Sequence, residues 1–326
     1  MNDKSLIVIG EALIDFIPDS QGCALKDVPS FTKAAGGAPA NVAGTVAKLG
    51  GKAKILTKLG QDAFGDYLID CMNSAGIDTS YLRQDPSHET SLAFVSLTND
   101  GNREFMFYRK NAADLYYNCD DIDPACLNDA GIIHFCSVDL VESKMKQAHL
   151  KLIELAKMNH CLISFDPNLR FPLWDDLNAL KQTVQSFLPL ANIIKISEEE
   201  LEFTTGTNDP VVASKALLNE VTQVFIYTKG SQGCELFTND FHVACDALPI
   251  QAVDTTGAGD SFIGAFIYKL LNQTDYSLRH ISESTYQAML DFASLVSAYV
   301  CCQKGALTAL PSMNQLKQFS ETRANH

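Results

Sequence analysis

One stretch of the sequence decides the fold and the site: Ala252-Val253-Asp254-Thr255-Thr256-Gly257-Ala258-Gly259-Asp260-Ser261-Phe262-Ile263-Gly264-Ala265. It predicts a strand end, a tight glycine turn and an apolar helix that runs to about Leu271. Because Gly257, Ala258 and Gly259 leave almost no side chain in the turn, their N–H groups can face an anion. Asp260 is either a first-turn stabiliser of the helix or a base beside an anion hole, as phosphoryl transfer to a hydroxyl requires.

Two common nucleotide-binding motifs are absent from the sequence. A dinucleotide fingerprint needs a third glycine after Gly257 and Gly259, but Phe262 occupies that position. Gly51-Lys52 is followed by Ala53, so it is not a Walker A sequence. These departures disfavour a dinucleotide-dependent oxidoreductase, and any nucleotide must be bound by another scaffold.

Composition indicates a globular protein whose partners are small molecules. The chain has 326 residues, of which 46% are hydrophobic and 20% charged, enough for a sizeable core. The net charge of −14 argues against nucleic acid as a partner, since a basic surface is missing. It also means that local donors must hold any anionic ligand.

The cysteines and the N-terminus predict a cytoplasmic protein with no membrane partner. The ten cysteines form no C-x-x-C pair, and several lie in apolar runs. Buried free thiols in a reducing compartment are therefore favoured over disulfides or a zinc site. The N-terminus enters the apolar run Leu6–Gly10 without a basic region or a long hydrophobic segment.

Short apolar runs alternate with helical patterns along most of the chain. This alternation predicts a doubly wound α/β fold, with a mostly parallel sheet and helices on both faces. The predicted strands are Leu6–Gly10, Ala53–Leu59, Gly131–Cys136, Cys161–Asp166, Asn192–Ser197 and Gln223–Thr228. The predicted helices are Ala40–Leu49, Asp62–Ala75, Glu142–Met158, Leu177–Phe187 and Val211–Glu220.

Two excursions interrupt the alternation and predict a small β-sheet lid. The first covers about residues 12–35 and is polar, with Pro18, Gly22 and Pro29. The second, about residues 90–112, predicts a β-hairpin with a turn at Asn99–Asn102. A further hairpin is expected for residues 233–245. The whole of 1–326 is expected to form a single domain.

Two groups of residues near the N-terminus offer polar contacts to a ligand. Asp15 follows the first strand, and the carboxyl ends of such strands bind ligands in open α/β sheets. Gly36 and Gly37 precede a helix and allow close approach of the backbone to a ligand. Asn41 offers a donor and an acceptor to a hydroxyl. Each feature alone is equally typical of an ordinary loop or helix cap.

Together these motifs resemble those of the PfkB, or ribokinase-like, family of carbohydrate kinases over nearly the whole chain. The first signature is Gly36-Gly37-Ala38-Pro39-Ala40-Asn41-Val42-Ala43, and the second runs from Asp254 to Asp260. Within the family the chain is most similar to fructokinases. The segments that carry this similarity are Gly10–Pro18, Arg103–Asp114, Asp166–Trp174 and Ser197–Phe203.

The resemblance implies an ATP-dependent sugar kinase, with the acceptor bound beneath the lid. It assigns Asp260 as the base that takes a proton from the primary hydroxyl, for fructose the 6-hydroxyl. It assigns the anion hole for the γ-phosphate to Gly257, Ala258 and Gly259. It assigns contacts with the sugar to Asp15, Gly36, Gly37 and Asn41.

Charged residues elsewhere have weaker assignments. Arg109 ends a lid strand and Arg170 follows a strand end, so each is a candidate for contact with sugar or phosphate, or a structural ion pair. Glu200 matches the family's motif for magnesium and phosphate, although Ser197 replaces its usual Asn and an acidic first helix turn is the alternative. Lys195 is a candidate phosphate ligand or the partner in a structural ion pair.

The resemblance also implies a nucleotide side and two kinds of cation. Thr228, Gly230 and Gly233 match the family's nucleotide turn, where glycines permit close approach. Mg²⁺ is expected with ATP, held through water near Glu200. Many relatives bind a monovalent cation, usually potassium, largely through backbone carbonyls. Asp254 is the side chain predicted to support that ion.

Two other functions remain open from the sequence. Another kinase of the family, such as a 2-keto-3-deoxygluconate kinase, would phosphorylate a carboxylated acceptor and favour extra cationic groups in the sugar pocket. A catalytically silent sugar-binding regulatory protein would use the same scaffold without turnover. The sequence is compatible with a monomer or a homodimer.

Overall fold

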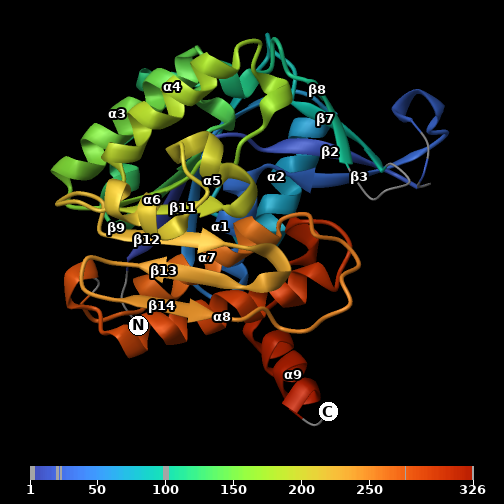
Figure 1. Cartoon of the computed structure of the whole chain (residues 1–326). Coiled ribbons are helices and arrows are strands. Elements are labelled where there is room, and N and C mark those ends of the chain that lie inside the picture. Colours follow the sequence, from blue (N-terminus) through green and yellow to red (C-terminus); the bar gives the residue numbers. More distant parts are fainter. Residues whose placement is uncertain (1–3, 20–21, 23, 98–102, 276, 325–326) are drawn as a thin grey trace.

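The computed structural model describes residues 4–19, 22, 24–97, 103–275 and 277–324. Its centre is an eight-stranded sheet with the order β14-β13-β12-β11-β10-β9-β1-β4 (Figure 1). Strands β12 to β4 in this order are parallel, and the antiparallel pair β13–β14 extends one edge. The strands are β1 (Ser5–Ile9), β4 (Lys52–Leu56), β9 (Ala130–Cys136), β10 (Leu162–Asp166), β11 (Ile193–Ser197), β12 (Val224–Thr228), β13 (Cys234–Phe237) and β14 (His242–Cys245).

Helices cover both faces of this sheet, as the alternation predicts. In β1, Leu6 and Val8 join one buried cluster, while Ile7 and Ile9 join the other. Side chains alternate between the faces of a strand, so a strand covered on both sides is apolar throughout. The first face carries α1 (Ala38–Lys48), α2 (Ala63–Ala75), α7 (Ala258–Leu271) and α8 (Glu283–Cys301). The second carries α3 (Lys144–Met158), α4 (Leu177–Phe187), α5 (Glu198–Thr205) and α6 (Pro210–Leu217), and α9 (Met313–Ala324) lies near the C-terminus.

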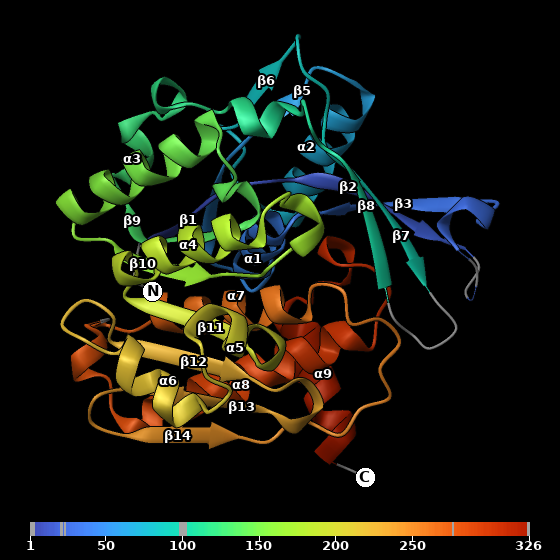
Figure 2. The ribbon, with the colours of Figure 1, turned by 45° about the horizontal axis from the view of Figure 1, so that its top comes forward.

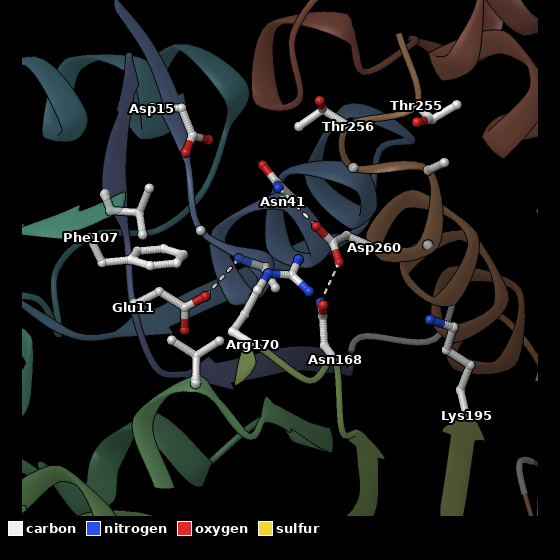
Figure 3. Close-up of a pocket in the computed structure, with 17 residues that line it drawn as sticks. Glu11, Asp15, Asn41, Phe107, Asn168, Arg170, Lys195, Thr255, Thr256 and Asp260 are labelled. Carbon is white, nitrogen blue, oxygen red and sulfur yellow. Dashed lines mark hydrogen bonds between the residues drawn. The ribbon is translucent and has the colours of Figure 1, made fainter. Parts of the chain in front are cut away.

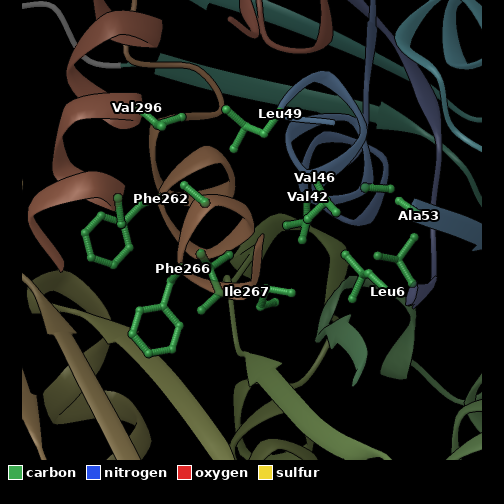
Figure 4. Close-up of a cluster of buried hydrophobic side chains, with 14 of the residues drawn as sticks. Leu6, Val42, Val46, Leu49, Ala53, Phe262, Phe266, Ile267 and Val296 are labelled. Carbon is green, nitrogen blue, oxygen red and sulfur yellow. The ribbon is translucent and has the colours of Figure 1, made fainter. Parts of the chain in front are cut away.

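Helices α1 and α7 pack closely because small residues line their contact. A Cβ at Gly264 would lie 2.7 Å from Thr45 Cβ and 3.0 Å from the carbonyl oxygen of Val42. Figure 4 shows Val42 of α1 and Ile267 of α7 in the same buried cluster. This packing brings the start of α7 next to the first turn of α1.

A second, four-stranded sheet extends from one end of the molecule (Figure 2). We call it the small sheet; its order is β3 (Phe31–Gly36), β2 (Leu13–Pro18), β7 (Leu92–Leu97) and β8 (Arg103–Tyr108). Phe16 and Phe94 stack across neighbouring strands with ring centroids 4.7 Å apart. The predicted β7–β8 hairpin is confirmed, and its turn at Asn99–Asn102 lies outside the described residues. The hairpin expected in residues 233–245 is the antiparallel pair β13–β14.

Two predicted elements differ from the structure. The strand predicted for Ala53–Leu59 is split, because β4 ends at Leu56 and the chain continues into β5 (Lys58–Gly60). Strand β5 pairs with β6 (Arg83–Asp85) in a separate two-stranded sheet. The helix predicted for Val211–Glu220 ends at Leu217, where the Asn219 side chain accepts hydrogen bonds from the N–H groups of Val221 and Thr222 and forms a turn.

The cysteines and helices agree with a globular interior. Every cysteine within the described ranges is a free thiol, and Cys23 lies outside them. Among the described residues, none of the helices combines the length and apolar character needed to span a bilayer. The extent of a single domain over 1–326, with lid segments at about 12–35 and 90–112, stays a prediction.

Candidate active site

A cavity of about 210 Å³ lies between the small sheet and the carboxyl ends of β1 and β10 (Figure 3). Residues far apart in the sequence meet there, because the first-strand loop, α1, the loop after β10 and the start of α7 all reach this edge. The site residues predicted from sequence that line the cavity are Asp15, Gly37, Asn41, Arg170, Lys195, Gly257, Ala258, Gly259 and Asp260. Open α/β sheets bind ligands at this edge.

The glycine turn forms one wall of the cavity. Gly257 has φ +73° and precedes α7, with no side-chain cap on the helix. The first-turn N–H groups of Gly259 and Asp260 therefore have no helical carbonyl to bond with. A Cβ at Gly259 would lie 3.0 Å from Lys195 Nζ, so glycine at this position lets the ammonium group approach the turn. The predicted glycine turn and the helix to Leu271 are confirmed. The strand end predicted before the turn is wrong, because β14 ends at Cys245 and the N–H groups of Val253 and Asp254 bond to the carbonyl oxygen of Cys301 at the end of α8, not to a neighbouring strand.

Two amides hold the carboxylate of Asp260. Asn41 Nδ2 donates to Oδ2 at 2.9 Å, and Asn168 Nδ2 donates to Oδ1 at 3.0 Å (Figure 3). Burial raises the pKa of Asp260 above its ordinary value. The hydrogen bond from Asn41, the charges of Arg170 and Lys195 and the hydrogen bond from Asn168 oppose this shift. The carboxylate is thus oriented by fixed donors and faces the cavity.

Asn168 is a site residue that we did not predict from the sequence. It follows β10 and has φ +46°, a left-handed conformation that asparagine tolerates better than most residues. This conformation aims its amide at Asp260. The available signal was the sequence Asp166-Pro167-Asn168 directly after a buried strand.

Lys195 joins the cavity to a buried ion pair. Its Nζ lies 2.8 Å from Asp166 Oδ2, and the side chains are 6% and 1% exposed. Burial opposes the charge on Lys195, but the carboxylates of Asp166, Glu200 and Asp260 outweigh burial and raise the pKa of the lysine. The lysine is therefore charged, and its position beside Gly259 also places it within the cavity lining.

Glu11 is a second lining residue that we did not predict. It follows β1 and is 2% exposed, and its Oε1 accepts a hydrogen bond from the N–H of Ala38 at 2.9 Å. Burial raises the pKa of Glu11 to about 7, against the charge of Arg109. The backbone at Gly37 packs closely against that of Glu11, because a Cβ at Gly37 would lie 2.5 Å from the Glu11 carbonyl oxygen. Phe107 of β8 covers another part of the cavity (Figure 3).

Arg109 and Glu200 lie outside the cavity lining, and their contacts with a ligand stay predictions. Arg109 is 5% exposed and forms ion pairs with Asp114 and Asp139. Glu200 accepts hydrogen bonds from Ser197 Oγ at 2.8 Å and from the N–H of Leu169 at 2.5 Å. In both cases protein groups already satisfy the charge, so the structural alternatives describe these contacts.

The remaining predicted residues lie outside the cavity lining. Asp254 accepts hydrogen bonds from the N–H of Thr256 at 2.9 Å and from the N–H of Gly305 at 3.0 Å. It therefore joins the loop before α7 to the turn after α8. The other predicted residues outside the lining are Gly36, beside Asp15, and Thr228, Gly230 and Gly233 at the end of β12.

Comparisons with known proteins agree with this geometry. The profile of the pfkB family carbohydrate kinases matches residues 3–313. The chain belongs to this family. It is 40% identical to probable fructokinase-4 of Arabidopsis thaliana over 97% of each chain. The resemblance inferred from the two glycine signatures is thereby confirmed.

Solved structures of sugar kinases have the same architecture. A fructokinase from Xylella fastidiosa with bound ATP superposes with a TM-score of 0.88 at 30% identity, covering 99% of this chain and 100% of that one. A fructokinase double mutant from Vibrio cholerae O395, with fructose, ADP and potassium ion bound, gives 0.87 at 31% identity and covers 98% of each chain. The doubly wound, ribokinase-like fold of this pfkB kinase is therefore established.

We predict that Glu11 makes the stability of this pfkB kinase depend on pH. Its pKa is about 7 in the folded protein and 4.5 ordinarily, so the folded state binds the proton more tightly. The stability that this proton contributes to the fold is fully present below the unfolded-state pKa of 4.5, and it is lost as pH rises through the folded-state pKa of about 7. Glu11→Gln keeps an acceptor for Ala38 but cannot ionise. The difference in unfolding free energy, variant minus wild type, should therefore be roughly 3 kcal/mol more positive at pH 8 than at pH 4.

Denaturant unfolding of both proteins at several pH values measures this difference. Groups other than Glu11 titrate in both proteins and cancel in the comparison. Parallel stability curves over this range would contradict the assignment of a raised pKa to Glu11.

We predict that Asn168 lowers the pKa of Asp260 in the free enzyme. Asn168→Gly keeps the left-handed backbone accessible and removes the amide donor. Loss of a hydrogen bond to the ionised form raises a carboxyl pKa, so the acid limb of kcat/KM should move to higher pH. The pH–rate profile measures the shift, and Asn178→Gly at the exposed start of α4 is the control. An acid limb that stays in place in Asn168→Gly would show that Asn168 does not lower the pKa of Asp260.

Proposed function

We propose that the chain is an ATP-dependent fructokinase that transfers the γ-phosphate of ATP to the 6-hydroxyl of D-fructose. The observation that carries this proposal is the Asp260 carboxylate, which two amides orient at the uncapped start of α7. Family membership and fructokinase relatives over nearly the whole chain support the substrate class. ATP is the donor that the matching structures favour.

The phosphate would lie at the glycine turn. The N–H donors of residues 257–259 and the positive end of α7 suit an anion. Lys195 and Arg170 line the same cavity and add positive charge that the net charge of −14 does not supply. In phosphoryl transfer, most of the catalysis comes from positioning and from stabilising charge on the transferring group. Arg170 is the cation we assign to that group.

The acceptor sugar would lie on the opposite side of Asp260. Asn41 Oδ1 is buried and has no hydrogen-bond partner among the described residues, while its amide nitrogen holds Asp260. It can therefore accept a hydrogen bond from a sugar hydroxyl, and the Asp15 carboxylate lines the cavity nearby (Figure 3). Buried acceptors of this kind reject an acceptor that lacks the matching hydroxyl. Gly37 allows the backbone to approach, and Gly36 adjoins Asp15.

Asp260 would act as the base in the transfer. A carboxylate oxygen of Asp260 takes the proton of the 6-hydroxyl, and the hydroxyl oxygen forms a bond to the γ-phosphorus. The bond from the γ-phosphorus to the oxygen of the β-phosphate breaks, and ADP leaves. In a loose transition state the hydroxyl loses its proton late, so a strongly basic group is not required. The donors from Asn41 and Asn168 favour the ionised form of the carboxylate and hold its orientation, which favours the transfer.

Mg²⁺ fits this site as an ion bound chiefly by the nucleotide. Among the described residues there is no cluster of three acidic, histidine or cysteine side chains that could hold a metal. Glu200 is engaged by Ser197 and Leu169. Magnesium commonly keeps several waters and binds substrate phosphates, so it would neutralise phosphate charge here. Glu200 would contribute only through water.

A monovalent cation fits the loop that Asp254 supports. Because the Asp254 carboxylate accepts from Thr256 and Gly305, it orders the backbone of two segments. Carbonyl oxygens of these segments would hold potassium, whose charge would support the phosphate end of the site. Thr228, Gly230 and Gly233 are proposed to contact the nucleotide. Cytoplasmic location and assembly as a monomer or homodimer stay predictions.

The buried charges favour a neutral sugar over a carboxylated one. Arg109, a candidate for contact with the acceptor, is already paired with Asp114 and Asp139. The cavity lining instead includes the carboxyl groups of Glu11 and Asp15. A sugar acid would therefore meet like charge, which makes 2-keto-3-deoxygluconate the weaker alternative.

A panel of acceptors tests the proposed function. We expect ATP turnover, measured as ADP release with Mg²⁺, to be greatest with D-fructose among fructose, ribose, 2-keto-3-deoxygluconate and adenosine. Omission of potassium should lower the rate. Turnover of the sugar acid without turnover of fructose would replace the proposal, and no turnover with any sugar would favour the silent sugar-binding alternative.

We predict that Asp260→Asn lowers kcat by about 10²–10⁴-fold, because the amide cannot take the hydroxyl proton. Calorimetric titration should show ATP affinity within about twofold of wild type, since the carboxylate is not assigned to the nucleotide. Asp275→Asn, an exposed residue after α7, is the matched control. Turnover near the wild-type value would refute the role of Asp260 as base.

A further inference from the structure

One buried carboxylate, Asp114, ties both ends of the β7–β8 hairpin to the body of the protein. Ser91, directly before β7, donates from Oγ to the two carboxylate oxygens of Asp114 at 3.0 Å each. Arg109, directly after β8, donates from Nε at 3.0 Å and from Nη2 at 2.8 Å. Asp114 lies in the short 3₁₀ helix Ala113–Tyr116 and is 1% exposed. The hairpin therefore leaves and re-enters the body at one anchored point.

Arg109 continues this anchor to the wall of the cavity. Its Nη1 donates to the carbonyl oxygen of Val138 at 3.3 Å, and Nη2 also pairs with Asp139. Val138 lines the cavity, and so does Phe107, two residues before Arg109 on the hairpin. The guanidinium group thus lies directly behind the wall that faces the proposed sugar, bonded to the wall itself.

Buried carboxylates around Arg109 already balance its positive charge, so it does not attract a further anion. Asp114 and Asp139 are both 1% exposed, and the nearby Glu11 is 2% exposed. A guanidinium that loses its carboxylate partners would become a strong, bidentate binder of another carboxylate. Asp114 accepts two of the guanidinium hydrogen bonds that prevent this, so its removal should change both the position of the wall and the charge behind it.

We propose that Asp114 is a positioning residue that sets the specificity of the acceptor pocket. By anchoring Ser91 and Arg109 it fixes the hairpin that carries Phe107, and it keeps the guanidinium group paired behind the wall, so that the pocket takes a neutral sugar. This inference rests on the proposed sugar-kinase function. Asp114 does not line the cavity and would act through its partners.

Asp114→Asn tests the anchor with little change in side-chain size. We expect the KM for fructose to rise about tenfold while the KM for ATP stays within about twofold, because only the acceptor wall is loosened. The preference in kcat/KM for fructose over 2-keto-3-deoxygluconate should narrow by about tenfold, because the charge of Arg109, no longer matched by Asp114, attracts the acid more strongly although the pair with Asp139 remains. In Asp114→Asn/Arg109→Gln, the gain on the acid should disappear.

Asp129→Asn is the matched control, since Asp129 pairs with Lys54 at the amino end of β9, away from the cavity. It should leave the sugar preference unchanged. An unchanged fructose KM and sugar preference in Asp114→Asn would overturn the proposal, as would the same changes in the control. If Asp114→Asn does not fold, Ser91→Ala removes one anchor and should raise the fructose KM with ATP unaffected; an unchanged KM would overturn the proposal.

Hydrogen exchange separates this proposal from the proposed function. In Asp114→Asn, or in Ser91→Ala if only that variant folds, the amides of Leu92–Leu97 should exchange at least about tenfold faster than in wild type, while those of β9 stay protected. Equal exchange in the hairpin would overturn the anchor even if fructose is a good substrate. Faster exchange would support the anchor even if the wild-type protein turns over no sugar. That lack of turnover would contradict the proposed function but not the anchor.

Discussion

The site depends on one interaction, the pair of amide hydrogen bonds that hold the buried carboxylate of Asp260. Asn41 comes from α1, Asn168 from the loop after β10, and Asp260 from α7. An uncompensated buried carboxylate costs several kcal/mol, so these donors make its position tolerable. Asn41 reaches it because α1 and α7 pack closely at Gly264, and Asn168 reaches it from the carboxyl end of β10. The apolar packing of two helices thus sets the distance at which Asn41 holds the carboxylate.

At the same edge of the sheet, the acidic and the basic side chains of the cavity lie in two different regions. Glu11 and Asp15 lie where the acceptor is proposed to bind, while Arg170 and Lys195 lie where the phosphate is proposed to bind. Lys195 keeps its charge because Asp166 pairs with it in the interior. A chain with a net charge of −14 can therefore present a local positive region to ATP. Asp260 lies between the two regions, where an alcohol would meet a phosphate.

The main sheet could be predicted from the sequence because its strands are buried on both faces. The run Leu6–Gly10 is apolar throughout, and the glycine turn before α7 is visible in the residues themselves. The division between β4 and β5 was missed because β5 pairs with β6, and local sequence does not identify a partner 25 residues away. The contact of Asn168 with Asp260 and that of Arg109 with Asp139 were missed for the same reason, since Asp139 lies 30 residues beyond that arginine.

Two acidic residues in first helical turns show what local sequence can still distinguish. Glu200 follows Ser197 by three positions, the spacing of a capping box, and its carboxylate is consumed by that serine and by Leu169. Asp260 follows Gly257 by three positions, and glycine offers no side chain to close such a box. The donors of its helix therefore stay available to a ligand, while amides from other elements hold the carboxylate. The residue three positions before the acid thus separates a carboxylate that closes a capping box from one that faces the cavity.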